Sequence, residues 1–130
     1  MRDIIFKGKR KDKSEWVEGY LLKVKTLSPS SAKWVEKNLV LIRQDEVYEV
    51  LPETVGQYTG LLDKDGNKVF EGDIISFGLR FCVVRYDEEN ARYMFYENGR
   101  HKLDGFNCET MKLKEVIGNI HDNPEMLEVK

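Results

Sequence analysis

Hydrophobic side chains recur at every second position in much of this chain, which is the spacing of extended strands with two unlike faces. The clearest early example is residues 16–24, where alternate positions place five residues on one face: Trp16, Glu18, Tyr20, Leu22 and Val24. A short apolar run at 4–6 precedes it, and the polar residues 9–14 separate the two. The pattern therefore predicts that the chain opens with a β-hairpin.

The segment from residue 26 to residue 53 has a less regular pattern. Ser28-Pro29-Ser30-Ser31 marks a loop, and Ser31 is placed to cap a short helix over 32–37. An apolar run then predicts a buried strand at 38–43, and a second predicts a strand at 47–51 that Pro52 ends.

Hairpin signals dominate the second half of the chain. The apolar stretches 57–62 and 69–70 flank Asp65-Gly66, a dipeptide typical of tight hairpin turns. A strand is expected at 74–77, and the β-rich runs 79–86 and 91–96 form another hairpin.

Three further features complete the reading of the second half. Residues 97–100 predict a turn, and an apolar run follows at 113–120. Asn123 and Pro124 then predict one closing helical turn, with Asn123 at its N-cap.

Many short strands at intervals of about ten residues predict an all-β fold, built from hairpins as small barrel-like, SH3-like β units. We expect either a single domain of residues 1–130 or two small β subdomains of about 1–52 and 53–130.

Composition narrows the class of protein. The 130 residues are 41% hydrophobic and 34% charged, and 21 basic against 23 acidic residues give a net charge of −2. This balance is typical of a globular chain and offers no overall positive charge to attract nucleic acid or an acidic membrane. We find no signal-peptide pattern and no apolar run long enough to span a membrane, so the expected compartment is the cytoplasm.

Cys82 and Cys108 are too few for a disulfide framework in a chain of this length. Cys82 lies in an apolar run and is expected to be buried, whereas Cys108 lies in a polar stretch. The sequence alone does not decide whether a disulfide joins the two cysteines.

No residue is assigned a catalytic, cofactor-binding or metal-binding role. Asp63, Asp65 and Asn67 alternate as the first ligands of an EF-hand do, but the positions for its glycine and its bidentate glutamate hold Lys68 and Ile74. Glu71 and Asp73 could act as paired carboxylates, but two acids in a turn are more typical of a solvated surface. We therefore expect that the protein is not an enzyme.

Nucleic-acid binding is the alternative with most support from the residues. Basic and aromatic side chains alternate between 80 and 102, and small β-barrels bind single strands by stacking bases on aromatic side chains beside cations. The candidate residues are Arg92, Tyr93, Arg100 and Lys102.

Three stretches resemble a known family. They are QYTGLLDKDGNKVFEGDII at 57–75, EVIGNIHDNPEML at 115–127 and, more weakly, RDIIFK at 2–7. Together they resemble the YopX-like proteins of bacteriophages and prophages, a predominantly β family with barrel-like folding. The biochemical activity of this family is not established, so the resemblance assigns no catalytic or binding role to any residue of this chain.

The resemblance implies an accessory protein of a phage or prophage, acting in the cytoplasm of the bacterial host. We expect a non-catalytic module that binds a protein partner or assembles with copies of itself as a homo-oligomer, without cofactor or membrane. Nucleic-acid binding is the alternative.

Overall fold

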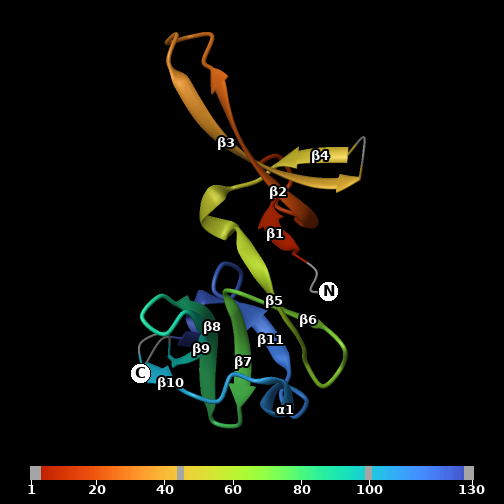
Figure 1. The fold of residues 1–130 in the computed structure, drawn as a ribbon, viewed down its shortest axis with the longest axis vertical. Coiled ribbons are helices and arrows are strands. Elements are labelled where there is room, and N and C mark those ends of the chain that lie inside the picture. Colours follow the sequence, from red (N-terminus) through yellow and green to blue (C-terminus); the bar gives the residue numbers. More distant parts are fainter. Residues whose placement is uncertain (1–3, 44–45, 99–100, 128–130) are drawn as a thin grey trace. The chain divides into compact units, whose positions relative to one another are not determined.

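The computed structural model describes residues 4–43, 46–98 and 101–127, and of residues 41–43 only the backbone. Contacts divide the chain after Gln57 into two compact units. Each unit is built on antiparallel strands (Figure 1).

The first unit is one antiparallel sheet in the order β4-β3-β2-β1-β5. Its strands are β1 (Phe6–Lys9), β2 (Trp16–Leu27), β3 (Trp34–Arg43), β4 (Glu46–Glu49) and the first residues of β5 (Gly56–Leu62). A short 3-10 turn, η1 (Pro52–Thr54), leads into β5.

The interior of the first unit is small and lies where β1 meets the segment after β4. Val40 and Val50 are fully buried there. A side chain at Gly8 would place its Cβ 2.9 Å from the Cβ of Val50, so only glycine fits this close approach. The Thr54 hydroxyl accepts a hydrogen bond from the Lys9 N–H at 2.9 Å, which ties η1 to β1.

The second unit contains the rest of β5 and a five-stranded sheet in the order β10-β9-β8-β7-β11. Its further elements are β6 (Lys68–Phe70), β7 (Asp73–Phe77), β8 (Arg80–Asp87), β9 (Arg92–Glu97), β10 (His101–Leu103), α1 (Cys108–Met111), β11 (Val116–Asn119) and a 3-10 turn, η2 (Pro124–Leu127).

A hydrophobic core lies inside the second unit. Its buried members come from β6, β7, β8, β9 and α1: Val69, Ile75, Cys82, Val84, Phe95 and Met111. The Phe95 ring meets the rings of Phe77 and Phe106 edge to face, with centroids 4.8 Å and 5.2 Å away. Such pairs add to the gain from burying the apolar surface.

The turn between β5 and β6 is organised by the carboxylate of Asp63. It accepts hydrogen bonds from the backbone N–H groups of Asp65, Asn67 and Val116 at 2.9 to 3.0 Å. Burial by itself would raise the pKa of Asp63, but these hydrogen bonds to the charged form outweigh it and lower the pKa. The residues that resembled EF-hand ligands thus form a hairpin turn that is fastened to β11.

The prediction of an all-β fold is confirmed. The opening hairpin, the Asp65-Gly66 hairpin and the hairpin at 87–90 are present as predicted. Within the described strands the two sheets stay open and do not close into a barrel. Of the turn predicted at 97–100, residues 99 and 100 lie outside the described residues.

The helix predicted at 32–37 is wrong, because residues 34–37 begin strand β3. Ser28 and Lys33 close the loop with a backbone hydrogen bond of 2.8 Å, so Ser31 lies in a hairpin loop instead of capping a helix. Trp34 and Val35 favour strands intrinsically, and pairing with β2 satisfies their backbone groups.

The solvated turn predicted for Asp73 is also wrong. Asp73 is buried and accepts a hydrogen bond from the Phe70 N–H at 2.8 Å, so it fastens the bend between β6 and β7. Cys82 is buried and Cys108 exposed, and both thiols are free.

Candidate functional site

The hairpin formed by β2 and β3 is the most unusual feature of the first unit. The two strands pair from Tyr20 with residue 41 to Leu27 with Trp34. Strand β1 covers only residues 16–19 of β2, and β4 pairs with β3 only from Leu39 onward. The outer part of the hairpin is therefore a two-stranded ribbon that extends past its neighbours (Figure 1).

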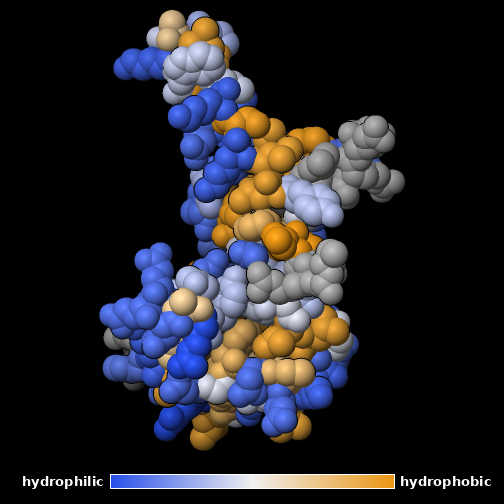
Figure 2. Space-filling view, in the orientation of Figure 1, coloured by the Kyte–Doolittle hydropathy of each residue, from blue (hydrophilic) through white to orange (hydrophobic). Residues whose placement is uncertain are grey.

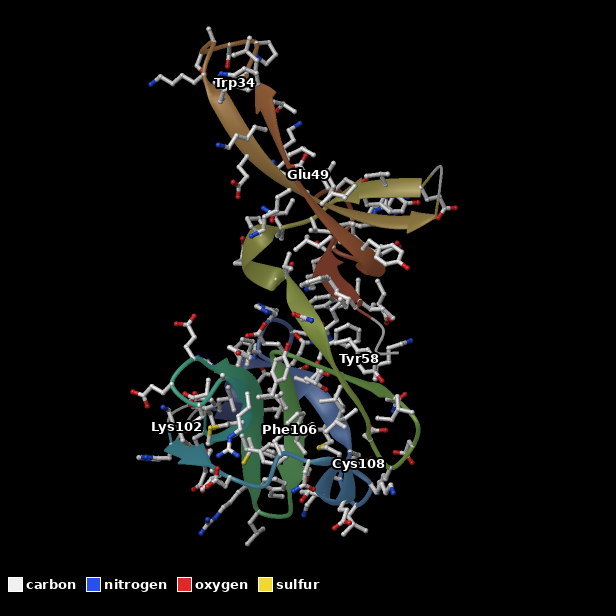
Figure 3. All side chains as sticks on the ribbon, viewed as in Figure 1. Trp34, Glu49, Tyr58, Lys102, Phe106 and Cys108 are labelled. Carbon is white, nitrogen blue, oxygen red and sulfur yellow. The ribbon has the colours of Figure 1, made fainter. Side chains whose placement is uncertain are left out.

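Large hydrophobic side chains lie at the end of this ribbon. Leu27 and Trp34 are opposite each other beside the loop, and their side chains are 54% and 70% exposed. Figure 3 shows Trp34 at the tip of the hairpin. An isolated two-stranded ribbon has no core in which to bury such residues.

One face of the ribbon is also apolar. Residues directly opposite in an antiparallel pair share a face, so the register places one set together: Tyr20, Leu22, Val24, Val35, Leu39 and, on β4, Val47. Tyr20 is 64% exposed, and Leu22, Val35 and Val47 are exposed as well. We call this set the apolar face. Figure 2 shows hydrophobic side chains gathered along the hairpin and beside β4.

Lys37, a basic residue on the same face of the ribbon as the apolar face, is partly neutralised. Lys37 lies opposite Val24, and its Nζ is 3.8 Å from a carboxylate oxygen of Glu49. Glu49 lies beside the middle of the ribbon in Figure 3 and also meets Lys11 at 3.4 Å.

The other face of the ribbon, on which Leu27 and Trp34 lie at the tip, carries charges next to them. Lys23 lies opposite Asn38, and Lys25 lies opposite Glu36. Lys23, Lys25 and Glu36 are exposed, and no ion pair joins any of them to another described residue. Toward the base the same face becomes apolar, with Leu21 opposite the buried Val40.

Of the residues predicted for nucleic-acid binding, Arg92 and Tyr93 lie on β9 and Lys102 lies on β10, in the second unit. Arg92 is paired with Asp104 at 2.6 Å, and Lys102 with Asp87 at 2.7 Å and Glu89 at 2.9 Å. Tyr93 is half-buried, with its ring against those of Tyr86 and Phe106. Arg100 lies outside the described residues. The cations are thus held by acids, and the aromatic ring is committed to packing.

Asp87 is the centre of this ionic cluster. Besides Lys102, it accepts hydrogen bonds from the Tyr96 hydroxyl at 2.9 Å and the Asn90 side-chain amide at 2.6 Å. The hydrogen bond from Lys102 is the largest cause that lowers the pKa of Asp87 to about 2, and the same contact raises the pKa of Lys102. These contacts therefore hold β8, β9 and β10 together.

The hairpin surface was missed by reasoning from the sequence, although a signal was present. Leu27 and Trp34 flank the Ser-Pro loop symmetrically, and alternate apolar residues continue on both sides of it. Once residues 32–37 are assigned to a helix, the second half of this alternation is lost.

Two smaller observations complete the description of the surface. Within the described ranges, no three His, Cys, Asp or Glu side chains gather as a metal site. Nor does the part of the chain that the structure describes contain a helix long and apolar enough to cross a membrane.

Fold and surface together define a small all-β protein of two units with an exposed apolar hairpin. The family model "YopX protein" matches residues 5–128, and the chain belongs to this family.

Among solved structures, the chain is similar to the crystal structure of protein EF1440 from Enterococcus faecalis. The two share 24% sequence identity with a TM-score of 0.60, over 98% of this chain and 100% of that one. At this identity the likeness supports the fold alone. No curated protein sequence matches this chain.

Proposed function

We propose that this protein is a non-catalytic accessory protein of bacteriophages and prophages, which binds a protein partner through the β2–β3 hairpin in the cytoplasm of the bacterial host. The observation that carries the proposal is the exposed apolar face. The exposed pair Leu27 and Trp34 adds further apolar surface at the tip, on the opposite face of the ribbon. Contiguous exposed apolar surface with a polar surround is characteristic of interaction sites.

The chemistry of the exposed residues fits a protein interface. Tryptophan and tyrosine are enriched among the residues that dominate binding energy, and the hairpin exposes Tyr20 on the apolar face and Trp34 at the tip of the opposite face. Burying a fully exposed leucine gains roughly 1.5 to 3 kcal/mol, so covering Leu22, which is 39% exposed, gains about 1 kcal/mol before the cost of association is subtracted.

Nucleic acid fits the observations less well. Phosphate contacts require available cations, whereas Arg92 and Lys102 are each held by carboxylates. The acids of this cluster would also repel a phosphate backbone.

A capture experiment tests the proposal. The tagged protein is incubated with lysate of a bacterium that carries the phage, in parallel with a Tyr20→Ser/Val35→Ser variant. A Leu113→Ser variant is the control, because Leu113 is also an exposed hydrophobic residue but lies in the second unit. We expect wild type and control to retain one discrete protein, and the hairpin variant to lose at least about tenfold of it.

Two results would contradict the proposal. One is equal retention by the hairpin variant. The other is a salt-sensitive gel shift of DNA or RNA that Arg92→Ala/Tyr93→Ala weakens, which would favour the nucleic-acid alternative.

A further inference from the structure

The outer edge of β2 is available for strand pairing. On one side β2 pairs with β3 along the ribbon, and on the other β1 pairs only with Trp16–Gly19. No described strand pairs with the remaining edge, the eight residues Tyr20–Leu27. At about 3.3 Å per residue this edge is roughly 26 Å long, and every second residue directs its N–H and C=O outward.

The side chains along this edge alternate in chemistry. Lys23 and Lys25 stand on one face, with Leu21 and Leu27 on either side of them, and Tyr20, Leu22 and Val24 stand on the apolar face. Any strand added here places its own side chains about 5 Å from these, on the same two faces. Its residues beside the lysines are favoured when acidic, and its residues beside the apolar face are favoured when hydrophobic.

We propose that the occupant of the β2 edge is an extended segment of the partner protein in which acidic and apolar residues alternate, added to β2 as a further strand. This inference rests on the proposed function and names the class of partner. Main-chain hydrogen bonds along the edge supply affinity, and the alternating side chains supply specificity, as in other cases of β-strand addition.

A second copy of this chain does not fit the edge. If two β2 edges pair antiparallel about Val24, Lys23 of one lies opposite Lys25 of the other. Shifting the register by one place on either side sets Lys23 against Lys23 or Lys25 against Lys25. Like charges directly opposite are destabilising, and lysines on an edge strand are a known protection against self-pairing.

Nucleic acid also fits the edge less well than a peptide. A phosphate backbone would meet Lys23 and Lys25 but would leave Leu22 and Val24 without an apolar partner. An alternating strand satisfies both faces at once.

A charge-swap experiment with defined peptides tests the proposal. The probe is the acetylated and amidated octapeptide TVEVEVET, titrated to about 1 mM against the isotopically labelled full chain and followed by amide chemical shifts. The controls are TVKVKVKT and the scrambled peptide TEEEVVVT. We expect the first peptide alone to bind wild type, with the shifts confined to Tyr20–Leu27 and its neighbours on β3.

The variant Lys23→Glu/Lys25→Glu should reverse the preference. We expect it to bind TVEVEVET about tenfold more weakly and to acquire binding of TVKVKVKT, because attractive cross-strand pairs become repulsive. The matched control is Lys13→Glu/Lys112→Glu, which changes the net charge equally at two exposed lysines away from the edge and should leave the preference unchanged.

Three outcomes would overturn the proposal. They are no shifts with TVEVEVET up to the highest concentration, equal binding of the scrambled peptide, and a gel shift of duplex DNA or RNA that Lys23→Glu/Lys25→Glu abolishes in place of peptide binding. Loss of partner capture by Tyr20→Ser/Val35→Ser without any peptide binding would reject strand addition and leave the docking function standing.

Discussion

At the scale of single residues, buried carboxylates hold this fold at its bends. Asp63 and Asp73 each accept hydrogen bonds from backbone N–H groups, and Asp87 accepts them from Lys102, Asn90 and Tyr96. A buried charge is costly unless it is paired or hydrogen-bonded. Each of these carboxylates therefore depends on the partners that surround it.

The first prediction concerns Asp87. We expect Asp87→Asn to lower the melting temperature at pH 7, because the amide keeps the shape but loses the charge that Lys102 contacts. The pKa of Asp87 is lowered on folding, to about 2, from roughly 3.9 in unfolded chains. Its stabilisation is therefore complete above about pH 5 and is lost progressively as the pH falls toward 2.

Thermal unfolding of wild type and variant between pH 2 and 7 measures this effect. The difference in melting temperature should be constant from pH 7 to about 5 and should shrink as acid protonates Asp87. Asp104→Asn is the control, since Asp104 forms an exposed ion pair with Arg92, and exposed pairs contribute little. A pH-independent difference for Asp87→Asn would contradict the assignment.

At the scale of elements, the β2–β3 hairpin has a base that contributes to the folded interior and a tip whose apolar side chains are available to a partner. Its base contributes Val40 to the interior, whereas its tip presents Leu27 and Trp34 to solvent. Exposed apolar residues of this kind add little to folding, so their presence needs another explanation.

The second prediction follows from this division. We expect Leu27→Ser/Trp34→Ser to change the free energy of unfolding by less than about 1 kcal/mol, the range of one cross-strand pair. Val40→Ser, on the same strand but fully buried, should cost about 3 kcal/mol or more. Urea unfolding measures both. If the tip variant proved as unstable as Val40→Ser, the tip would be part of the folding core.

Elements with strong local signals were predictable from the sequence. Asp65-Gly66 specifies a hairpin because Gly66 has φ +81° and Asp63 fastens the turn. The helix predicted at 32–37 failed because Ser31 is an equally good loop residue, and pairing with β2 decides between the two. The burial of Asp73 depends on the packing of distant strands, which no local pattern reveals.

The predicted nucleic-acid surface also depends on contacts between residues that are distant in the sequence. The residues Arg92 and Lys102 had the right chemistry for nucleic acid, but their acidic partners Asp104 and Asp87 are brought to them by the folded chain. The hairpin face could have been found by aligning alternate residues on both sides of the Ser-Pro loop, since the register follows that symmetry.

At the scale of the whole molecule, the two cysteines report on folding independently of the hairpin. Cys82 is in the core of the second unit, and burial raises the pKa of its thiol to about 11. Cys108 begins α1 and is exposed. Reactivity toward alkylating and disulfide reagents requires thiolate and access, so the two thiols should differ sharply.

The third prediction is a labelling pattern. At pH 8, a thiol-reactive chromogenic reagent should titrate one thiol per chain rapidly in native protein and a second only in denaturant. Cys108→Ser should remove the rapid phase entirely. Rapid reaction of two thiols in the native wild type would show that the core around Cys82 opens readily.

The pairing of strand β5 determines how the chain could be cut into separate units. Its first residues, Gly56 and Gln57, pair with β1, and from Tyr58 onward it pairs with β6. The boundary between the units thus falls inside strand β5, where its pairing passes from β1 to β6, and not in a linker. Dividing the chain there would leave Gly56 and Gln57 paired with β1 but would cut β5 in two, so both fragments would need a redesigned strand end.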